Sequence, residues 1–294
     1  MKTSKTLDEM IDPGVVVRYR QKKYSNVTDD FKEEINEDYL VLEEPLEILV
    51  NGELISITMR TPGNDDVLAI GFLFSEGIIK SLKDIKKLED NCKSGNSCNL
   101  LNVYLPINNG KKTPKDIKKL RRGTLTSASC GVCGRQSIDD MLEICEKQKI
   151  NSTFPKEVIS KSTEILSDQQ INFSHTGGCH GSAILNRNGE VLASFEDVGR
   201  HNAVDKTIGD LIMRGLISRP PSKDLIKSPA LLVVSGRLSF DIVQKCAVAS
   251  IPVICSVSAP SSLAVDLANE VGITIASFVR DGNFNIYTHP DRIQ

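Results

Sequence analysis

The sequence lacks several features that would have narrowed its class at once. No apolar run approaches the roughly 18 residues that a membrane-spanning helix needs. Neither sign of charge dominates, because 36 Lys and Arg residues face 38 Asp and Glu residues, for a net charge of −2. No internal repeat and no long low-complexity tract occur. We therefore expect neither a membrane protein nor a globally basic nucleic-acid binder.

Cysteine is also scarce, and the first residues contain no export signal. Eight of the 294 residues are cysteines, and the stretch from Met1 to Glu9 has no apolar segment. We therefore expect reduced thiols, not a disulfide framework, and a cytoplasmic location. Cys246 and Cys255 stand in apolar stretches, where a cysteine usually acts as a small buried hydrophobic residue.

What is present is the composition of an ordinary folded protein. Hydrophobic residues make up 40% and charged residues 25% of the chain, which is enough to build a sizeable core. A length of 294 residues suggests about two domains. We predict a polar, irregular and flexible arm over residues 1–38, a smaller β-rich domain over 39–136, and an α/β domain over 137–294.

The smaller domain begins with a predicted hairpin. Residues 46–50 and 53–57 are largely apolar and are joined by Asn51-Gly52, a pair that favours a two-residue turn. The alternation of apolar side chains predicts that Ile48 pairs with Ile55, which places one apolar face on the core.

Hydrophobic periodicity and capping residues predict the other elements. They are a helix from Asn64 or Asp65 to Gly77, a strand at 99–107, helices after Ser137 and at 155–169, 200–213, 239–249 and 261–270, a hairpin of 182–185 with 191–195, and strands at 231–234, 253–257 and 274–279. Apolar strands that alternate with helices indicate an α/β fold with a mixed or parallel sheet, or α+β for the whole chain. Ligands of such sheets bind beyond the carboxyl ends of the strands.

The clearest candidate for chemistry is the motif Cys130-Gly131-Val132-Cys133. Residues 108–136 around it contain eight Lys or Arg residues and one Asp, a local charge of +7. We expect a mobile loop whose positive charge favours a thiolate. A lone Cys-x-x-Cys pair has three main interpretations, which are half of a zinc site, a dithiol redox couple and a nucleophilic sulfur carrier.

Zinc is the least favoured of the three, and no catalytic zinc is expected. Cys92 and Cys98 would have to complete the site, and their spacing is loose for a zinc ribbon. The zinc-deaminase signature needs a proline before the first cysteine and a glutamate in the histidine motif, where this sequence has Ser129 and Ser182. The redox interpretation stays open, although a thioredoxin-like pair starts a helix and residues 134–136 intervene here.

Two further motifs stand at predicted strand and helix ends. Gly177-Gly178 permits either a close approach to an anion or a tight entry into the hairpin that follows. Residues 196–202 join a strand to a helix, where we expect either an anion site or a helix cap formed by Asp197. The residue types alone leave open the roles of Cys179, His175, His180 and His201.

Together these motifs resemble those of the formate dehydrogenase accessory sulfurtransferases, the FdhD family. The resemblance runs from about residue 40 to the end of the chain. The blocks that carry it stand in the family's order at Ser129–Gly134, Thr176–His180, Glu196–Lys206, Ser235–Phe240, Ser258–Val265 and Phe278–Pro290.

The resemblance implies a sulfurtransferase with a cysteine persulfide intermediate. Cys130 matches the cysteine that accepts sulfur from a cysteine desulfurase. The sulfur then passes to a molybdenum (or tungsten) bis-guanine-dinucleotide cofactor, which is inserted into formate dehydrogenase. Cys133 matches the second cysteine, which assists attack or release.

The resemblance also implies a cofactor site, a fold and an oligomeric state. The cofactor-binding segment falls on Phe278, Val279, Arg280, Asp281, Gly282 and Asn283, and we add Arg237, which follows a predicted strand, and His180. The larger domain is expected to resemble the cytidine-deaminase fold without its zinc chemistry, and the protein to be a homodimer.

Three functional expectations go beyond these motifs or compete with them. The basic run 111–122 is expected to dock the desulfurase or the cofactor in a salt-dependent way. A chaperone that holds the cofactor without sulfur chemistry is one alternative function. A dithiol oxidoreductase that uses Cys130 and Cys133 is the other.

Overall fold

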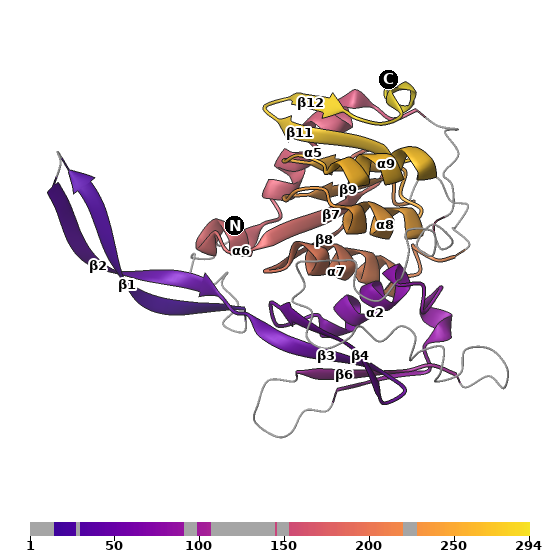
Figure 1. The fold of residues 1–294 in the computed structure, drawn as a ribbon, viewed down its shortest axis with the longest axis horizontal. Coiled ribbons are helices and arrows are strands. Elements are labelled where there is room, and N and C mark those ends of the chain that lie inside the picture. The colour runs from indigo at the N-terminus through magenta and orange to yellow at the C-terminus, as the bar shows by residue number, and fades with distance from the viewer. Residues whose placement is uncertain (1–14, 28–29, 91–98, 107–144, 146–152, 220–227) are drawn as a thin grey trace, which may run out of the picture.

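The structure is a computed structural model that describes residues 15–27, 30–90, 99–106, 145, 153–219 and 228–294. These residues form three sheets with helices packed around them (Figure 1). The sheets have the strand orders β12-β11-β10-β9-β7-β8, β4-β3-β6-β5 and β1-β2. This mixture confirms the predicted α/β (α+β overall) class, whereas the cytidine-deaminase-like fold stays a prediction.

The six-stranded sheet contains three adjacent parallel strands. They are β9 (Leu231–Val234), β10 (Val253–Ser256) and β11 (Thr274–Arg280). The antiparallel strands are β7 (His180–Leu185), β8 (Val191–Asp197) and β12 (Asn283–Ile286). β9 is apolar throughout because both of its faces are buried: Leu232 and Val234 belong to one hydrophobic cluster, and Leu231 and Val233 to another.

Helices cover both faces of this sheet, close to their predicted limits. On one face, α5 (Lys156–Ser167) contributes Ile159 and Leu166 to the smaller cluster. The other face carries α7 (Arg200–Met213), α8 (Phe240–Val248) and α9 (Ser262–Val271). None of the helices within the described ranges is both long and apolar enough to cross a membrane.

The four-stranded sheet contains the predicted hairpin, but the predicted register is wrong. β3 (Glu44–Val50) and β4 (Glu53–Arg60) turn at Asn51 and Gly52, and β5 (Lys87–Asp90) and β6 (Leu100–Tyr104) complete the sheet. Ile48 pairs with Ser56, not with Ile55, because a bulge adds one residue to β4. The bulge lets Ile55 stay buried and turns the polar Ser56 inward beside Ile48.

Helix α2 (Asp65–Ser75) joins the two large sheets. It lies against α7, and the two helices approach so closely at Gly71 and Gly209 that a Cβ on either residue would lie 1.9 Å from a backbone oxygen of the other helix. Side chains from both predicted domains therefore share one hydrophobic cluster, for example Leu46 and Ile254. The domain limits themselves stay a prediction.

Residues 16–41 form a long hairpin where we expected an irregular segment up to residue 38. β1 (Val16–Val27) and β2 (Asp30–Val41) pair along their whole length and extend away from the body of the molecule (Figure 1). The expectation is wrong because these two strands are marked by charged cross-strand pairs and not by apolar side chains. Arg18 pairs with Glu37 at 3.2 Å, and Lys22 pairs with Glu33 at 2.6 Å.

Three short elements were not predicted from the sequence. They are β5, β12 and α6 (Ile171–Thr176). None of them is long enough to show a clear hydrophobic period. The helix predicted after Ser137 lies outside the described residues.

Candidate functional site

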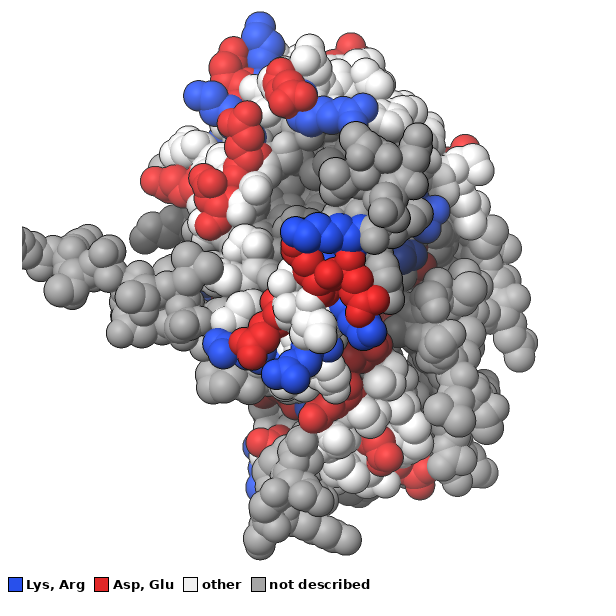
Figure 2. Space-filling view, turned by 90° about the vertical axis from the view of Figure 1, so that its left-hand side faces the viewer, with Lys and Arg blue, Asp and Glu red and all other residues white. Residues whose placement is uncertain are grey.

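The candidate site is the edge of the six-stranded sheet where β8, β9, β10 and β11 end. Strand β7 begins at this edge with His180, opposite Asp197 at the end of β8. Helices α7, α8 and α9 each start here, because each follows a strand that ends here. Their free backbone N–H groups and dipoles make the edge attractive to anions. Figure 2 faces this side of the molecule and shows basic and acidic side chains around a recessed area.

His180 and Arg200 both lie close to Gly236 at this edge. A Cβ built on Gly236 would be 3.4 Å from His180 Nδ1 and 3.5 Å from Arg200 Cδ. The two side chains come from β7 and from the first residue of α7, and Gly236 follows β9. His180 thus stands at the edge of the sheet, and Arg200, from the motif at residues 196–202, lies close to it.

The start of α7 is tied to the start of α8. His201 Nε2 is 3.2 Å from Ser239 Oγ and 3.8 Å from Asp241 Oδ2. Ser239 precedes α8 but forms no side-chain cap to it. His201 therefore links two helix N-termini, which gives a structural role to one of the histidines left open above.

Burial and a neighbouring positive charge determine the pKa of His180. Burial lowers the pKa of His180, and the nearby Arg200 charge lowers it further, while Asp197 acts in the opposite direction. Asp197 is itself neutralised, because its carboxylate lies 2.8 Å from Lys206 Nζ. The imidazole is therefore more easily deprotonated than an ordinary histidine.

The predicted cofactor segment, residues 278–283, spans the end of β11 and the turn into β12. Its backbone is unusual, because Phe278, Asp281 and Gly282 have φ values of 56°, 51° and 74°. Val279 is fully buried in the core, whereas residues 280–283 are exposed. The Arg280 guanidinium lies 6.0 Å from the centre of the Phe278 ring. Arg237, after β9, is also exposed.

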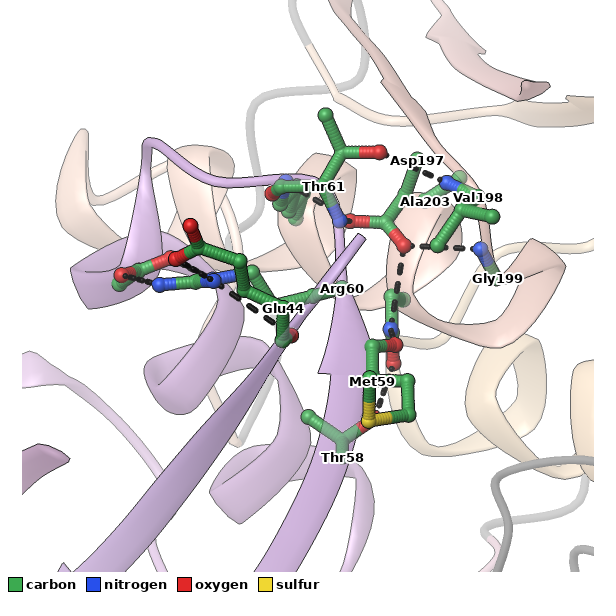
Figure 3. A network of polar contacts seen from close by, with 12 residues as sticks. Glu44, Thr58, Met59, Arg60, Thr61, Asp197, Val198, Gly199 and Ala203 are labelled. Carbon is green, nitrogen blue, oxygen red and sulfur yellow. Dashed lines mark hydrogen bonds and ion pairs between the residues drawn. The ribbon is translucent and has the colours of Figure 1, made fainter. Parts of the chain in front are cut away.

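A buried polar network lies directly behind this edge (Figure 3). Asp197 accepts hydrogen bonds from Thr61 N at 3.1 Å, Gly199 N at 2.8 Å and Asn202 Nδ2 at 3.1 Å. Lys206 Nζ donates to the Thr61 carbonyl at 2.8 Å and pairs with Asp197. Asp197 thus ties the end of β4 to the start of α7, so its described contacts are structural.

A second buried ion pair continues the network toward α8. Lys245 Nζ lies 2.7 Å from Asp205 Oδ1, and Ser75 Oγ donates to the same carboxylate at 3.0 Å. The pair joins α2, α7 and α8 in one place. Much of the motif Glu196–Lys206 therefore holds the molecule together, a role that the sequence analysis missed.

Cys179 is not activated for chemistry. It is 4% exposed, and burial, together with the charges of Glu196 and Asp197, raises its pKa to about 12. Gly177 has a φ of 62°, and a Cβ on Gly178 would lie 2.9 Å from Val41 Cγ1. Of the two interpretations of the glycine pair, these contacts favour a tight entry into the hairpin.

The remaining cysteines divide between the described and the undescribed parts of the chain. Cys246 and Cys255 are fully buried, as predicted, and burial raises the pKa of both thiols. Cys145 is partly exposed. The predicted sulfur site, Cys130 and Cys133, lies outside the described residues, and so do Cys92, Cys98 and the basic run 111–122.

Comparison with known proteins decides the family. A model of the FdhD/NarQ family matches residues 41–294. This chain belongs to the FdhD/NarQ family. The match begins next to residue 40, where the predicted resemblance began, and contains every motif block, while β1 and nearly all of β2 precede it.

Similar proteins of the FdhD/NarQ family span almost the whole chain. The sulfur carrier protein FdhD of Anaeromyxobacter dehalogenans is 43% identical over 258 residues, which cover 87% of this chain and 88% of that protein. The sulfur carrier protein FdhD of Sulfolobus acidocaldarius is 39% identical over 280 residues, covering 94% and 99%. A crystal structure from Desulfotalea psychrophila, described as a formate dehydrogenase accessory protein, matches with a TM-score of 0.68 and 26% identity, covering 94% of this chain and 99% of that one.

Proposed function

We propose that this protein is a sulfur carrier for formate dehydrogenase maturation. Cys130 takes sulfur from a cysteine desulfurase as a persulfide and delivers it to the molybdenum (or tungsten) bis-guanine-dinucleotide cofactor. The observation that carries the proposal is the gathering of helix N-termini and arginines at one sheet edge, in a chain whose relatives are named sulfur carrier proteins.

The first chemical step is a thiolate attack. The Cys130 thiolate attacks the outer sulfur of the desulfurase persulfide, a new S–S bond forms on Cys130, and the desulfurase cysteine leaves as a thiolate. The +7 charge of residues 108–136 favours the attacking thiolate. Cys133 is placed by its spacing to assist this attack or the later release of sulfur.

The cofactor is the acceptor substrate, and it is bound at the carboxyl edge of the sheet. Arg280 offers a planar, charged group to a guanine edge or a diphosphate, and Phe278 offers a stacking face. Val279 contributes only backbone, because its side chain is in the core. Arg237 and His180 extend the binding surface across β9 and β7.

The proposal includes three partners. The desulfurase donates the sulfur, formate dehydrogenase receives the mature cofactor, and a second copy of the chain forms a homodimer. The basic run 111–122 docks the desulfurase or the cofactor, so neutralising it should weaken sulfur loading or cofactor affinity in a salt-dependent way. Unchanged loading and unchanged affinity would contradict that part.

The deciding experiment is intact-protein mass spectrometry after incubation with a cysteine desulfurase and cysteine. We expect a gain of about 32 Da that a reductant removes and that maps to Cys130. Cys130→Ala should abolish the gain, and Cys179→Ala should not, because Cys179 is buried as a thiol.

The same spectra separate the two alternative functions. A loss of about 2 Da without any gain would indicate a Cys130–Cys133 disulfide and hence a dithiol oxidoreductase. An unchanged mass together with intact cofactor binding would indicate a chaperone that holds the cofactor without sulfur chemistry.

A further inference from the structure

The outer side of strand β1 is an open sheet edge. β1 pairs with β2 along its whole length, and within the described ranges it pairs with no other strand. In an antiparallel pair, every second residue turns its N–H and C=O groups away from the partner strand. Figure 1 shows the hairpin of β1 and β2 extending away from the body of the molecule. A further strand can therefore reach this row of donors and acceptors.

The side chains along this edge are basic and exposed. Arg18, Arg20 and Lys22 are alternate residues of β1, so they lie on one face of the hairpin, while Tyr19 and Lys23 lie on the other. All five side chains are exposed, Tyr19 at 58%. β1 contains no acidic residue. A strand that pairs with this edge would therefore meet cations and one aromatic ring.

The carboxylates of β2 neutralise only part of this charge. Arg18 pairs with Glu37 at 3.2 Å, and Lys22 pairs with Glu33 at 2.6 Å. Glu37 stands opposite Arg20 in the ladder, but its carboxylate contacts Arg18. Among the residues that the structure describes, Arg20 has no ion pair. A carboxylate on an added strand would lie opposite Arg20, with a further cation on either side.

This arrangement suits a peptide strand better than a nucleic acid. An added strand lies about 4.8 Å from β1 and about twice that distance from β2, so it meets the cations before the acids. A nucleic acid lying across a face of the hairpin would bring its phosphates close to Glu33 and Glu37 as well. Repulsion by these carboxylates would oppose such binding.

Strand β2 of a second copy is also acidic, but it is less suited to this edge. Its Glu33 and Glu37 side chains are already held by cations of their own hairpin. In addition, pairing β1 of one copy with β2 of the next uses different surfaces on the two copies. Such a contact does not close by two-fold symmetry, so it would build an open chain of molecules.

We propose that β1 binds an acidic, extended segment of another protein as a third strand of this hairpin. The backbone of the segment bonds to the open edge, and its alternate carboxylates lie opposite Arg18, Arg20 and Lys22. The residue opposite Tyr19 is apolar or aromatic. A neutral strand leaves these cations without partners, so the edge selects acidic strands. The family match begins at residue 41, after β1, so this binding goes beyond the proposed sulfur transfer.

The test is the binding of a blocked, fluorescent peptide, Glu-Thr-Glu-Val-Glu, to the full chain, followed by anisotropy. Run antiparallel to β1, this peptide places its valine opposite Tyr19 and its acids opposite the three alternate cations. We expect Arg20→Gln to weaken binding about threefold, and Arg20→Lys, which keeps the charge, to restore it. Lys32→Gln is the matched control on β2, because it removes the same charge from an exposed side chain and should leave the affinity unchanged.

Hydrogen exchange shows whether the peptide binds as a strand. On binding, the amides of residues 16–23 should exchange more slowly, because the open edge gains hydrogen bonds, while those of residues 32–41 should keep their rates. Equal exchange of residues 32–41 in native protein and Arg20→Gln would show that the variant keeps the hairpin.

Several results would overturn the proposal. They are no binding of the acidic peptide, equal binding of Gln-Thr-Gln-Val-Gln, and unchanged exchange of residues 16–23 in the complex. Single-stranded poly(dT) that binds more tightly than the peptide, and loses affinity in Arg20→Gln, would assign the edge to nucleic acid. Oligomers larger than a dimer that grow with concentration in sedimentation, and vanish in Arg20→Gln, would assign it to β2 of another copy.

Discussion

The close crossing of α2 and α7 makes a strong prediction for Gly209→Ala. In an isolated helix this change would stabilise by about 1 kcal/mol, because alanine is the better helix former. Here the added Cβ would lie 1.9 Å from the Val67 carbonyl oxygen and 2.9 Å from Gly71 N. These are backbone atoms, which cannot rotate out of the way as a side chain can. The sign of the effect should therefore be reversed.

The size of the effect follows from the distance that the helices must separate. Ordinary contact begins near 3.4 Å, so the contact must lengthen from 1.9 Å by about 1.5 Å. A movement of this size loosens the packing of buried residues such as Leu68 and Ile208. Overpacking costs about 1–3 kcal/mol, and more where backbone must move. We expect a net loss of roughly 3 kcal/mol in the free energy of unfolding.

Urea denaturation followed by circular dichroism measures this loss directly. A thermal scan should show a fall of roughly 6–12 °C in Tm. Asn269→Ala is the control, because Asn269 is exposed on α9 and the change should leave stability nearly unaltered. If Gly209→Ala is as stable as the native protein, the description of this helix contact is wrong.

Three further predictions concern the site. Lys206→Met should destabilise by about 3–5 kcal/mol in urea denaturation, because it leaves Asp197 buried without its cation, and adding Asp197→Asn should restore part of the loss; a single variant of native stability would contradict this. The pKa of His180 is lowered below 6.5 in the free protein, and a bound phosphate should raise it, so binding should take up a proton at pH 6.5. Calorimetry in buffers of different ionisation enthalpy should detect the uptake, which His180→Asn should abolish; equal heats in every buffer would count against it. The Cys179 pKa of about 12, against an ordinary 9.0, lowers the thiolate fraction about 1,000-fold, so Cys179 should resist alkylation and stay free of persulfide, as peptide mapping can check.

The elements that could be predicted are those whose sequence of apolar and polar residues follows directly from how the element is buried. β9 and α7 fall at their predicted residues, since Leu231–Val234 is buried on both faces and α7 is buried along most of its length. The register of β3 and β4 could not be predicted, because the bulge brings the polar Ser56 into the interior. The hairpin of β1 and β2 was missed because its pairing depends on charges that look like a solvated loop.

The candidate site was predicted only where a motif and a strand end coincide. His180 and residues 278–283 satisfy both conditions, and the structure places both at the carboxyl edge. Arg200 lies within residues 196–202, which were expected to form an anion site or a cap, but the burial of its Nε without a hydrogen bond could be seen only in the structure. Asp197 was expected as a cap or an anion-binding residue, but it contacts Thr61 and Lys206 instead. Thr61 is distant from Asp197 in the sequence, and Lys206 lies further along helix α7.

The hairpin of β1 and β2 also limits how copies of this protein can associate. A two-stranded sheet has two open edges, and each is a template for pairing with another chain. Residues 16–23 of β1 contain four basic residues and no acid, whereas residues 32–41 of β2 contain four acids and one lysine. A two-fold symmetric pairing of β1 with β1, or of β2 with β2, would therefore place like charges opposite each other. The arm thus disfavours two-fold symmetric edge pairing between identical copies and leaves β1 suited to an acidic strand.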